Sequence, residues 1–229
     1  MGAEHDQRMA RFAQAGLYVV VTEAFCAGRS AVDVLDACLG AGVRLVQFRE
    51  KEGSALSLFE RARVFRERTA KVGALLIVDD RVDLALALGA DGVHLGQEDL
   101  PIAAARAIAP ELILGSSSHN LQEALAAQAA GASYVNIGPI FATQTKQVAS
   151  GVIGPDAITT IAPHLRIPFT CMGGIKEHNA HEALERGART LAVVTAVTAA
   201  PDPALAAQVL LQKIYEHYPR SVIPAKAGI

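Results

Sequence analysis

A Gly-Ala pair followed by a short aliphatic run recurs five times along this chain of 229 residues. Each pair comes after a segment rich in Ala and Leu with the spacing of a helix. Glycine takes the left-handed conformation that closes a helix, and a short continuous apolar run is typical of a buried parallel strand. The repeat therefore predicts alternating helices and parallel strands. The pairs are Gly40-Ala41, Gly73-Ala74, Gly89-Ala90, Gly131-Ala132 and Gly187-Ala188.

Eight strand–helix units follow from this rhythm. Strands are predicted at 17–22, 43–46, 75–78, 93–95, 112–116, 134–137, 167–171 and 191–194. Helices are predicted at 31–39, 54–71, 82–88, 101–109, 121–130, 155–161, 179–186 and 203–218. The pattern predicts an α/β chain with a single-domain TIM (β/α)8 barrel over 17–218, with an open doubly wound sheet as the alternative. We expect a helical N-terminal extension over 1–16 and a flexible C-terminal tail over 219–229.

Composition excludes several classes of protein. Hydrophobic residues make up 51% of the chain and charged residues 19%, which argues against disorder. The formal net charge of -2 argues against nucleic acid as a partner. Residues 1–16 lack the apolar core of a signal peptide, and no apolar run reaches the ~18 residues of a membrane span. Three cysteines without a CxxC pair favour reduced thiols, so we expect a cytoplasmic protein with no membrane partner.

Polar and charged residues gather directly after the predicted strands. The segments concerned are 47–51, 79–81, 96–99, 116–119, 138–146, 173–175 and 194–195. The loops that follow the strands of a TIM barrel carry its active site. We therefore expect the functional residues of this chain at one end of the barrel.

Arg49 and Lys51 alternate after the second predicted strand, so both side chains can point the same way. Two fixed cations at a barrel mouth suit a phosphate or a carboxylate. A solvated strand end, paired with Glu50, explains them equally well.

Carboxylates follow the next two predicted strands, which are neighbours in a barrel. These residues are Asp79, Asp80, Glu98 and Asp99. Carboxylates that converge without His or Cys suit a hard cation such as Mg2+, which leaves positions for water and substrate phosphate. Surface acids that balance a neighbouring arginine and helix N-termini are the alternative. The two cations nearby favour the metal, because a diphosphate would use charges of both signs.

The loops after the last three strands offer groups for a second anion. The segment 143–146 holds two hydroxyls and a lysine, and Gly173-Gly174 lets the backbone approach a ligand. Val194-Thr195 ends the eighth strand, and loops after strands seven and eight of such barrels often bind phosphate. An exposed polar loop and a tight turn remain the plainer interpretations.

Two histidines lie near the same end. For His119 we favour a helix cap or a rim position over a role as acid or base, because it starts a helix. His94 alternates with apolar neighbours on its strand, so we expect a buried or rim histidine with its hydrogen bonds satisfied.

Taken in order, these segments resemble the thiamine-phosphate synthase family, also called thiamine-phosphate pyrophosphorylase. The resemblance runs over most of the barrel and is carried by 47–51, 80–85, 92–101, 138–141, 143–146 and 173–175. It implies a transferase that condenses an aminopyrimidine methyl diphosphate with a hydroxyethylthiazole phosphate to give thiamine phosphate and diphosphate. In the family the diphosphate leaves first, and the thiazole nitrogen attacks the resulting cation, so no protein nucleophile is required.

The resemblance also implies roles for individual residues. Asp80 and Asp99 would bind the cofactor Mg2+. The candidate catalytic residues would hold the departing diphosphate: Arg49, Lys51, Ser117 and Lys146. The other candidate substrate-binding residues are Gln47, Phe48, Glu50, Asp79, Thr143, Gln144, Thr145, Gly174, Val194 and Thr195. Of these, Gln47 would hold the pyrimidine diphosphate, and the residues from Thr143 onward would contact the thiazole phosphate.

This chain departs from the family at Asp79-Asp80, where Asn-Asp is common. An extra negative charge beside a diphosphate is unfavourable unless it is protonated, bound to metal or paired with Arg81. Two alternatives therefore stay open: a thiazole tautomerase with a base such as His119, and a non-catalytic barrel that binds thiazole or thiamine phosphate. Outer helices rich in Ala and Leu also make a homodimer a possible assembly.

The substitution Lys146→Ala tests the site that the resemblance implies. It should reduce turnover strongly and leave the melting temperature almost unchanged, because the residue is expected in an exposed loop. Steady-state kinetics and thermal unfolding measure the two effects, and wild-type activity in the variant would remove Lys146 from the site.

Overall fold

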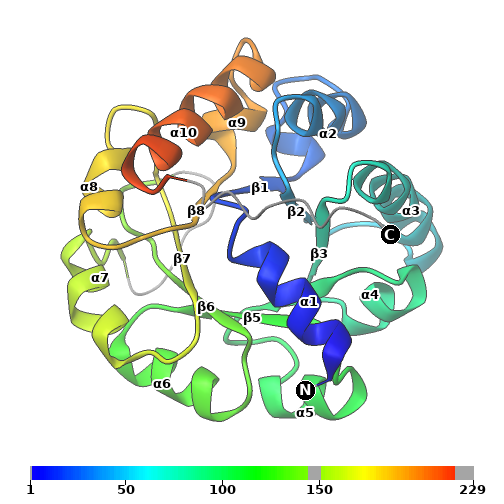
Figure 1. The fold of residues 1–229 in the computed structure, drawn as a ribbon. Helices are drawn as coiled ribbons and strands as arrows, with labels where there is room; N and C mark the ends of the chain where they lie inside the picture. The colour runs from blue at the N-terminus through cyan, green and yellow to red at the C-terminus, as the bar shows by residue number, and fades with distance from the viewer. Residues whose placement is uncertain (1, 144–150, 220–229) are drawn as a thin grey trace, which may run out of the picture.

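The computed structural model describes residues 2–143 and 151–219. Within them, eight parallel strands form a closed barrel in which each strand pairs with the next and β8 pairs with β1. Helices surround the barrel on the outside (Figure 1). The fold is the TIM (β/α)8 barrel predicted from the sequence, and the open sheet is excluded.

The strands lie close to their predicted positions, with two differences that affect the pocket. The second strand covers Leu45–Phe48 rather than 43–46, because its pairing with the first strand begins at Leu45 opposite Tyr18. The fifth strand continues to Ser118, so Ser117 also lies in a strand. The strands are β1 (Leu17–Val21), β2 (Leu45–Phe48), β3 (Leu75–Asp79), β4 (Gly92–Leu95), β5 (Ile113–Ser118), β6 (Tyr134–Ile137), β7 (Phe169–Met172) and β8 (Leu191–Val193).

The helices begin and end near the predicted residues. Several start at a side chain that accepts a hydrogen bond from the backbone of the first turn, as Ser54 and Asn120 do. The sequence did not predict α9 or the 3-10 turns η1 (Glu23–Phe25) and η2 (Ala162–His164). The α-helices are α1 (Ala3–Phe12), α2 (Ala31–Gly40), α3 (Ala55–Lys71), α4 (Val82–Leu88), α5 (Ile102–Ile108), α6 (Leu121–Ala129), α7 (Asp156–Ile161), α8 (Ala180–Glu185), α9 (Thr195–Thr198) and α10 (Pro203–His217).

Side chains alternate along each strand and so form two separate cores. Outward side chains, such as Val19 and Val46, pack beneath the surrounding helices in one large cluster. Inward side chains fill the barrel itself, and Phe12 of α1 packs against them with its ring centroid 4.7 Å from that of Tyr134. The inward cluster from the strands consists of Tyr18, Val20, Leu45, Leu75, Ile77, Ile113, Tyr134 and Ala192.

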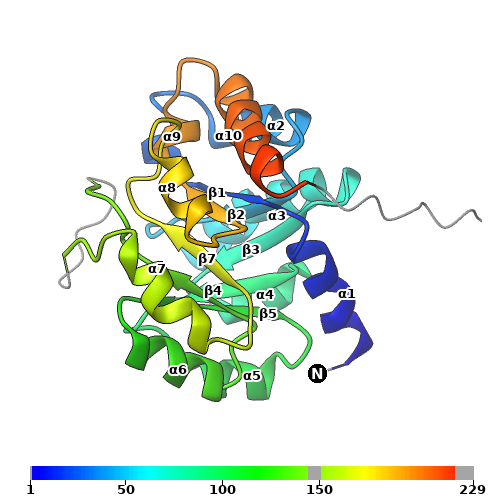
Figure 2. The same cartoon turned by 60° about the vertical axis from the view of Figure 1, so that its left-hand side comes forward.

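Helix α1 lies across the end of the barrel at which the strands begin (Figure 2). The Glu111 carboxylate, just before β5, accepts hydrogen bonds from the backbone N–H groups of Gly2 and His5 over 3.1 and 3.0 Å. Arg8 donates to the Glu111 carbonyl, and Arg11 donates to the Gly73 carbonyl just before β3. Because α1 closes this end, a ligand reaches the barrel interior from the other end.

The three cysteines are buried and unbridged, as expected of small packing residues. Burial raises the pKa of Cys26 to about 11 and that of Cys38 to about 12, and it raises the pKa of Cys171 further. No helix in the described part of the chain is long and apolar enough to cross a membrane. From residue 220 on, the predicted tail lies outside the described residues.

His5 ties α1 to the barrel and makes that contact sensitive to pH. The side chain is 4% exposed, and its Nε2 atom lies 2.9 Å from Ser133 Oγ. Burial lowers the His5 pKa, and the nearby charge of Arg106 lowers it further, against the opposing effects of Asp6 and Glu111. The folded protein therefore favours neutral His5.

Acid should destabilise the wild-type protein more than a His5→Gln variant. The unfolded chain binds the proton of this histidine at about pH 6.5, above the pKa of the folded state, so the stability from neutral His5 is complete above that pH and is lost as the pH falls below it. Urea unfolding between about pH 8 and pH 5 measures the slope. His181→Gln on the exposed face of α8 is the control, and equal slopes in wild type and His5→Gln would contradict the assignment.

Candidate active site at the carboxyl end of the barrel

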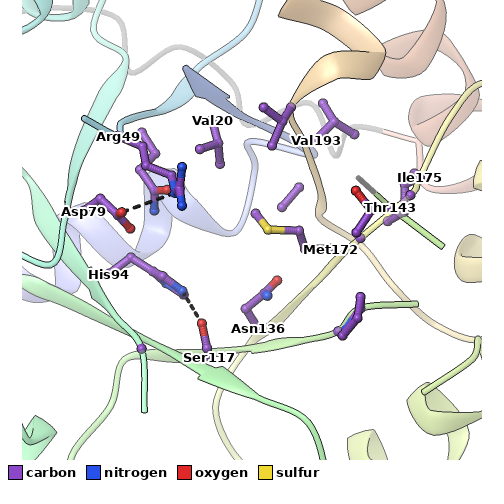
Figure 3. Close-up of a pocket in the computed structure, with 18 of the residues that line it drawn as sticks. Val20, Arg49, Asp79, His94, Ser117, Asn136, Thr143, Met172, Ile175 and Val193 are labelled. Atoms are coloured by element: carbon purple, nitrogen blue, oxygen red, sulfur yellow. Dashed lines mark hydrogen bonds and ion pairs between the residues drawn. The ribbon is translucent and has the colours of Figure 1, made fainter. Parts of the chain in front are cut away.

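A cavity of about 800 Å³ opens at the end of the barrel where the strands finish. Each of the eight strands, or the loop that follows it, contributes to its lining. The labelled side chains in Figure 3 converge on this cavity from opposite sides of the barrel. A cavity of this size at this end of a TIM barrel is the usual place for an active site.

Most of the candidate residues within the described part of the chain line this cavity. Gln144, Thr145 and Lys146 lie outside the described residues. Glu98 is exposed and does not line the cavity. The candidates that do are Gln47, Arg49, Lys51, Asp79, Asp80, Asp99, Ser117, Thr143, Gly174, Val194 and Thr195.

Two candidates, Phe48 and Glu50, are not part of the lining. Phe48 points outward from β2 and packs edge-on against Phe65 of α3, with the ring centroids 5.1 Å apart. Glu50 pairs with Arg61 of α3 at 2.9 Å and accepts from the backbone N–H of Glu23. Alternation along the strand explains both positions, since Gln47, Arg49 and Lys51 face the other way.

Arg49 and Lys51 form a compact ionic cluster with the carboxylates that follow β3. The Asp79 Oδ2 atom lies 2.9 Å from Lys51 Nζ and 3.4 Å from Arg49 Nε. Lys51 also pairs with Asp80. Arg81 pairs instead with Asp83, so the partners of Asp79 are the two pocket cations and not Arg81. The possible pairing of Arg49 and Lys51 with Glu50 is likewise not observed.

The ionic cluster shifts the pKa values of Asp79 and Lys51. Burial raises the pKa of Asp79, whose side chain is only 8% exposed, and repulsion from Asp80 raises it further against the attraction of Lys51 and Arg49. Burial alone would lower the pKa of Lys51, but Asp79 and Asp80 outweigh it and raise that pKa. Lys51 is therefore held as a cation at the mouth of the cavity.

Asp80 and Asp99 bring two carboxyl groups together from neighbouring strands. Each carboxyl affects the pKa of the other, and Asp99 Oδ2 accepts from the Gly96 N–H over 2.6 Å. Burial would raise the pKa of both carboxyls. The Lys51 cation outweighs this effect at Asp80 and lowers its pKa, whereas that of Asp99 is raised. Asp80 also has a backbone φ of 58°, which is rare outside glycine and concentrates at functional sites.

The floor of the cavity is a buried polar network that the sequence did not single out as a unit. His94 is buried, and its two ring nitrogens contact Tyr134 OH and Ser117 Oγ, as expected of a satisfied histidine. Tyr18 and Gln47 continue the network on the far side of Tyr134. In the sequence, Tyr18 and Tyr134 belong to the apolar runs that predict their strands. Only the folded barrel shows that their hydroxyl groups are in contact.

The opposite side of the cavity is formed by the backbone at Gly173 and Gly174, with the side chains of Ile175 and Lys176 beside it. Gly173 and Gly174, directly after β7, have φ of 101° and 62°, and a Cβ on Gly174 would overlap the Ala142 carbonyl oxygen. Val194 and Thr195 lie at the start of the short helix α9. This side carries no carboxylate within the described lining, so an anion meets no carboxylate repulsion there.

His119 lies at the rim of the cavity. Its Nδ1 atom is 2.8 Å from Glu123 Oε2, and Glu123 also accepts from the His119 N–H. Asn120 is the residue that caps α6. His119 therefore lies at the rim, which is one of the two expected positions, and does not cap the helix.

Comparisons with known proteins agree with this geometry. Residues 17–197 match the family model described as thiamine monophosphate synthase. The chain is 46% identical over 194 residues to a thiamine-phosphate synthase from Chloroflexus aurantiacus, covering 85% of this chain and 90% of the relative. It is 40% identical over 201 residues to a thiamine-phosphate synthase from Shouchella clausii, covering 87% and 96%.

A solved structure gives the same result in three dimensions. The thiamine phosphate pyrophosphorylase from Pyrococcus furiosus superimposes with a TM-score of 0.84 at 36% identity, covering 91% of this chain and 99% of that one. The family model and the relatives span nearly the whole barrel, including the strand ends that line the cavity. The chain therefore belongs to the thiamine monophosphate synthase family.

Proposed function

We infer that this chain is a thiamine-phosphate synthase, a transferase that joins an aminopyrimidine methyl diphosphate to a hydroxyethylthiazole phosphate and releases diphosphate. Membership of the family supports the reaction. The observation in the cavity that carries it is the meeting of two cations and a carboxylate pair at the ends of β2, β3 and β4. A diphosphate needs this combination, because cations bind its oxygens directly and carboxylates can bind a metal that does the same.

The residues at the ends of β3 and β4 fit magnesium. Asp80 and Asp99 lie close enough for each carboxyl to affect the pKa of the other, so a divalent cation between them would offset their mutual repulsion. The described residues contain no group of three or more His, Cys, Asp or Glu suited to a metal. Magnesium commonly uses one or two protein carboxylates and takes its other ligands from water and substrate phosphate. When bound, it would neutralise charge on the diphosphate oxygens.

Arg49, Lys51 and Ser117 would stabilise the leaving diphosphate. As the bond between the pyrimidine methylene carbon and the diphosphate oxygen breaks, its electron pair goes to that oxygen. Fixed cations and a hydroxyl donor lower the free energy of this developing charge more than that of the bound substrate. We also assign Lys146 this role, although it lies outside the described residues.

The glycine-rich side of the cavity would hold the second substrate. Backbone at Gly174 can approach a phosphate closely, and Thr143 and Thr195 line the same region. The thiazole nitrogen would then attack the methylene carbon, forming the new C–N bond. Apolar side chains such as Val20 and Met172 line the space between the two sides and limit the access of water to the cation.

The remaining expectations fit this enzyme. Buried free thiols agree with a cytoplasmic setting, where disulfides are rare. The thiazole tautomerase and the non-catalytic barrel are not favoured, because the full-length relatives are named as synthases. A homodimer remains a prediction of the sequence.

Release of diphosphate with both substrates present tests the function. We expect release that requires both substrates and Mg2+, with thiamine phosphate as the second product. Omission of either substrate and chelation of the metal are the controls. Binding of the thiazole phosphate without any release would reject the synthase and favour a tautomerase or a regulatory barrel.

Asp99→Asn tests the metal site. The variant should need an about tenfold higher Mg2+ concentration for half its maximal rate, because one of the two carboxylate ligands loses its charge. Initial rates across a magnesium titration measure the change. A magnesium response equal to that of the wild type would show that the ligand set is wrong.

Asp79→Asn tests the effect of the third carboxylate. Asp79 competes with a bound anion for Arg49 and Lys51, so its loss of charge should tighten binding of magnesium diphosphate roughly tenfold. Isothermal titration calorimetry measures the affinity. Asp83→Asn, which changes an exposed carboxylate paired with Arg81, should leave it unchanged. Equal or weaker binding by Asp79→Asn would contradict the competition.

A further inference from the structure

A chain of hydrogen bonds crosses the barrel beneath the cavity and joins two residues of its lining. Gln47 Nε2 donates to Tyr18 OH over 2.8 Å, and the Tyr18 and Tyr134 hydroxyl oxygens lie 3.2 Å apart. Tyr134 OH lies 2.9 Å from His94 Nδ1. His94 Nε2 lies 3.0 Å from Ser117 Oγ, the contact drawn in Figure 3. Gln47 and Ser117 line the cavity, and the two tyrosines lie below it.

With Gln47 as the donor to Tyr18, burial gives this series of hydrogen bonds a single direction. Tyr18 is 1% exposed and Tyr134 is 0% exposed, so a hydroxyl proton without an acceptor would be costly there. The Tyr18 oxygen already accepts from Gln47, so its own proton goes to Tyr134. The Tyr134 proton then goes to His94 Nδ1.

The His94 imidazole continues the same donor-to-acceptor order as far as Ser117. A neutral histidine has one acceptor nitrogen and one donor nitrogen. Because Nδ1 of His94 accepts from Tyr134, the ring proton lies on Nε2 and is donated to Ser117 Oγ. The Ser117 hydroxyl then has its own proton available for an acceptor in the cavity.

We propose that Tyr18, Tyr134 and His94 are positioning residues that aim the hydroxyl proton of Ser117 at the leaving diphosphate. A hydroxyl that presents its proton stabilises an oxygen that gains negative charge, whereas one that presents its lone pair repels it. The identity of the acceptor rests on the proposed function, but the direction of the chain does not.

The same series of hydrogen bonds connects Gln47, which would bind the aminopyrimidine end of the first substrate, with Ser117, which would bind its diphosphate end. With Nε2 of Gln47 on Tyr18, the amide oxygen Oε1 is left to accept from a ligand, and the amino group of an aminopyrimidine is such a donor. If the Gln47 amide were rotated so that Oε1 faced Tyr18, donor and acceptor would exchange in every hydrogen bond of the series. Ser117 would then donate to His94. An amino donor at Gln47 and an anionic oxygen at Ser117 therefore select the same direction.

Packing holds the Tyr134 and His94 rings in place. A Cβ at position 115 would overlap the Tyr134 ring, and glycine there gives that ring its space. The Tyr134 ring also stacks against His94, with the centroids 5.6 Å apart, and packs in a tilted arrangement against Phe12 of α1. The direction of the chain is thus set by donors and acceptors rather than by ring movement.

Nitrogen-15 NMR of histidine-labelled protein tests the direction in the wild type. At about pH 8, where an ordinary histidine is neutral, we expect His94 to carry its proton on Nε2 and to accept at Nδ1. Loss of the resonances in His94→Asn assigns them. Tyr134→Phe should shift the Nδ1 resonance, because it removes the donor. A proton on Nδ1 in the wild type, or an Nδ1 resonance unmoved in Tyr134→Phe, would overturn the proposal.

Kinetics test the consequence for the reaction. Tyr134→Phe should lower kcat about tenfold and leave KM for the diphosphate substrate nearly unchanged, because the Ser117 proton acts as charge develops. Tyr218→Phe, which removes a hydroxyl that donates to the Leu184 carbonyl outside the cavity, should keep the wild-type kcat. An equal fall in both variants, or a change in KM alone, would overturn the positioning role. A wild type that releases no diphosphate would reject the proposed function, and the NMR result would still decide the direction.

Discussion

Alternation of side chains along eight parallel strands decides which residues can take part in chemistry. Residues two apart on a strand face the same side, so Gln47 and Arg49 reach the cavity while Phe48 packs beneath α3. Closure of the barrel then brings all eight strand ends to one rim. Lys51 and Asp99, far apart in the sequence, meet there for that reason. Helix α1 closes the other end, so the cavity has one mouth.

The cavity separates two kinds of electrostatic environment. On one side, two cations and three carboxylates lie together, so both cations are already at the cavity before a diphosphate arrives. Once the diphosphate has taken the place of Asp79 beside them, these charges do not have to reorganise again when the leaving group gains charge. On the other side, backbone and hydroxyl groups offer donors without a carboxylate in the described lining. The two substrates carry different phosphate groups, and this division suits each of them.

The sequence predicted the barrel because each strand and helix has a local signature, such as the glycine that ends a helix before an apolar run. It predicted most of the cavity because residues that follow strands share one rim. Phe48 and Glu50 belong to the segment that carries the resemblance but do not line the cavity, because side chains alternate along the strand and these two face α3. The sequence did not predict the contact between the Tyr18 and Tyr134 hydroxyls, because that contact depends on closure of the barrel and on the space left by Gly115.

A crystal structure with magnesium, diphosphate and thiamine phosphate would show which side of the cavity binds the diphosphate. We expect diphosphate on Arg49 and Lys51, with Asp80 and Asp99 holding the metal. Lys51 would have turned from Asp79 toward the diphosphate, and Ser117 would donate to a diphosphate oxygen. Diphosphate bound only at Gly173-Gly174, with the Lys51–Asp79 pair intact, would mean that the two cations do not hold the leaving group.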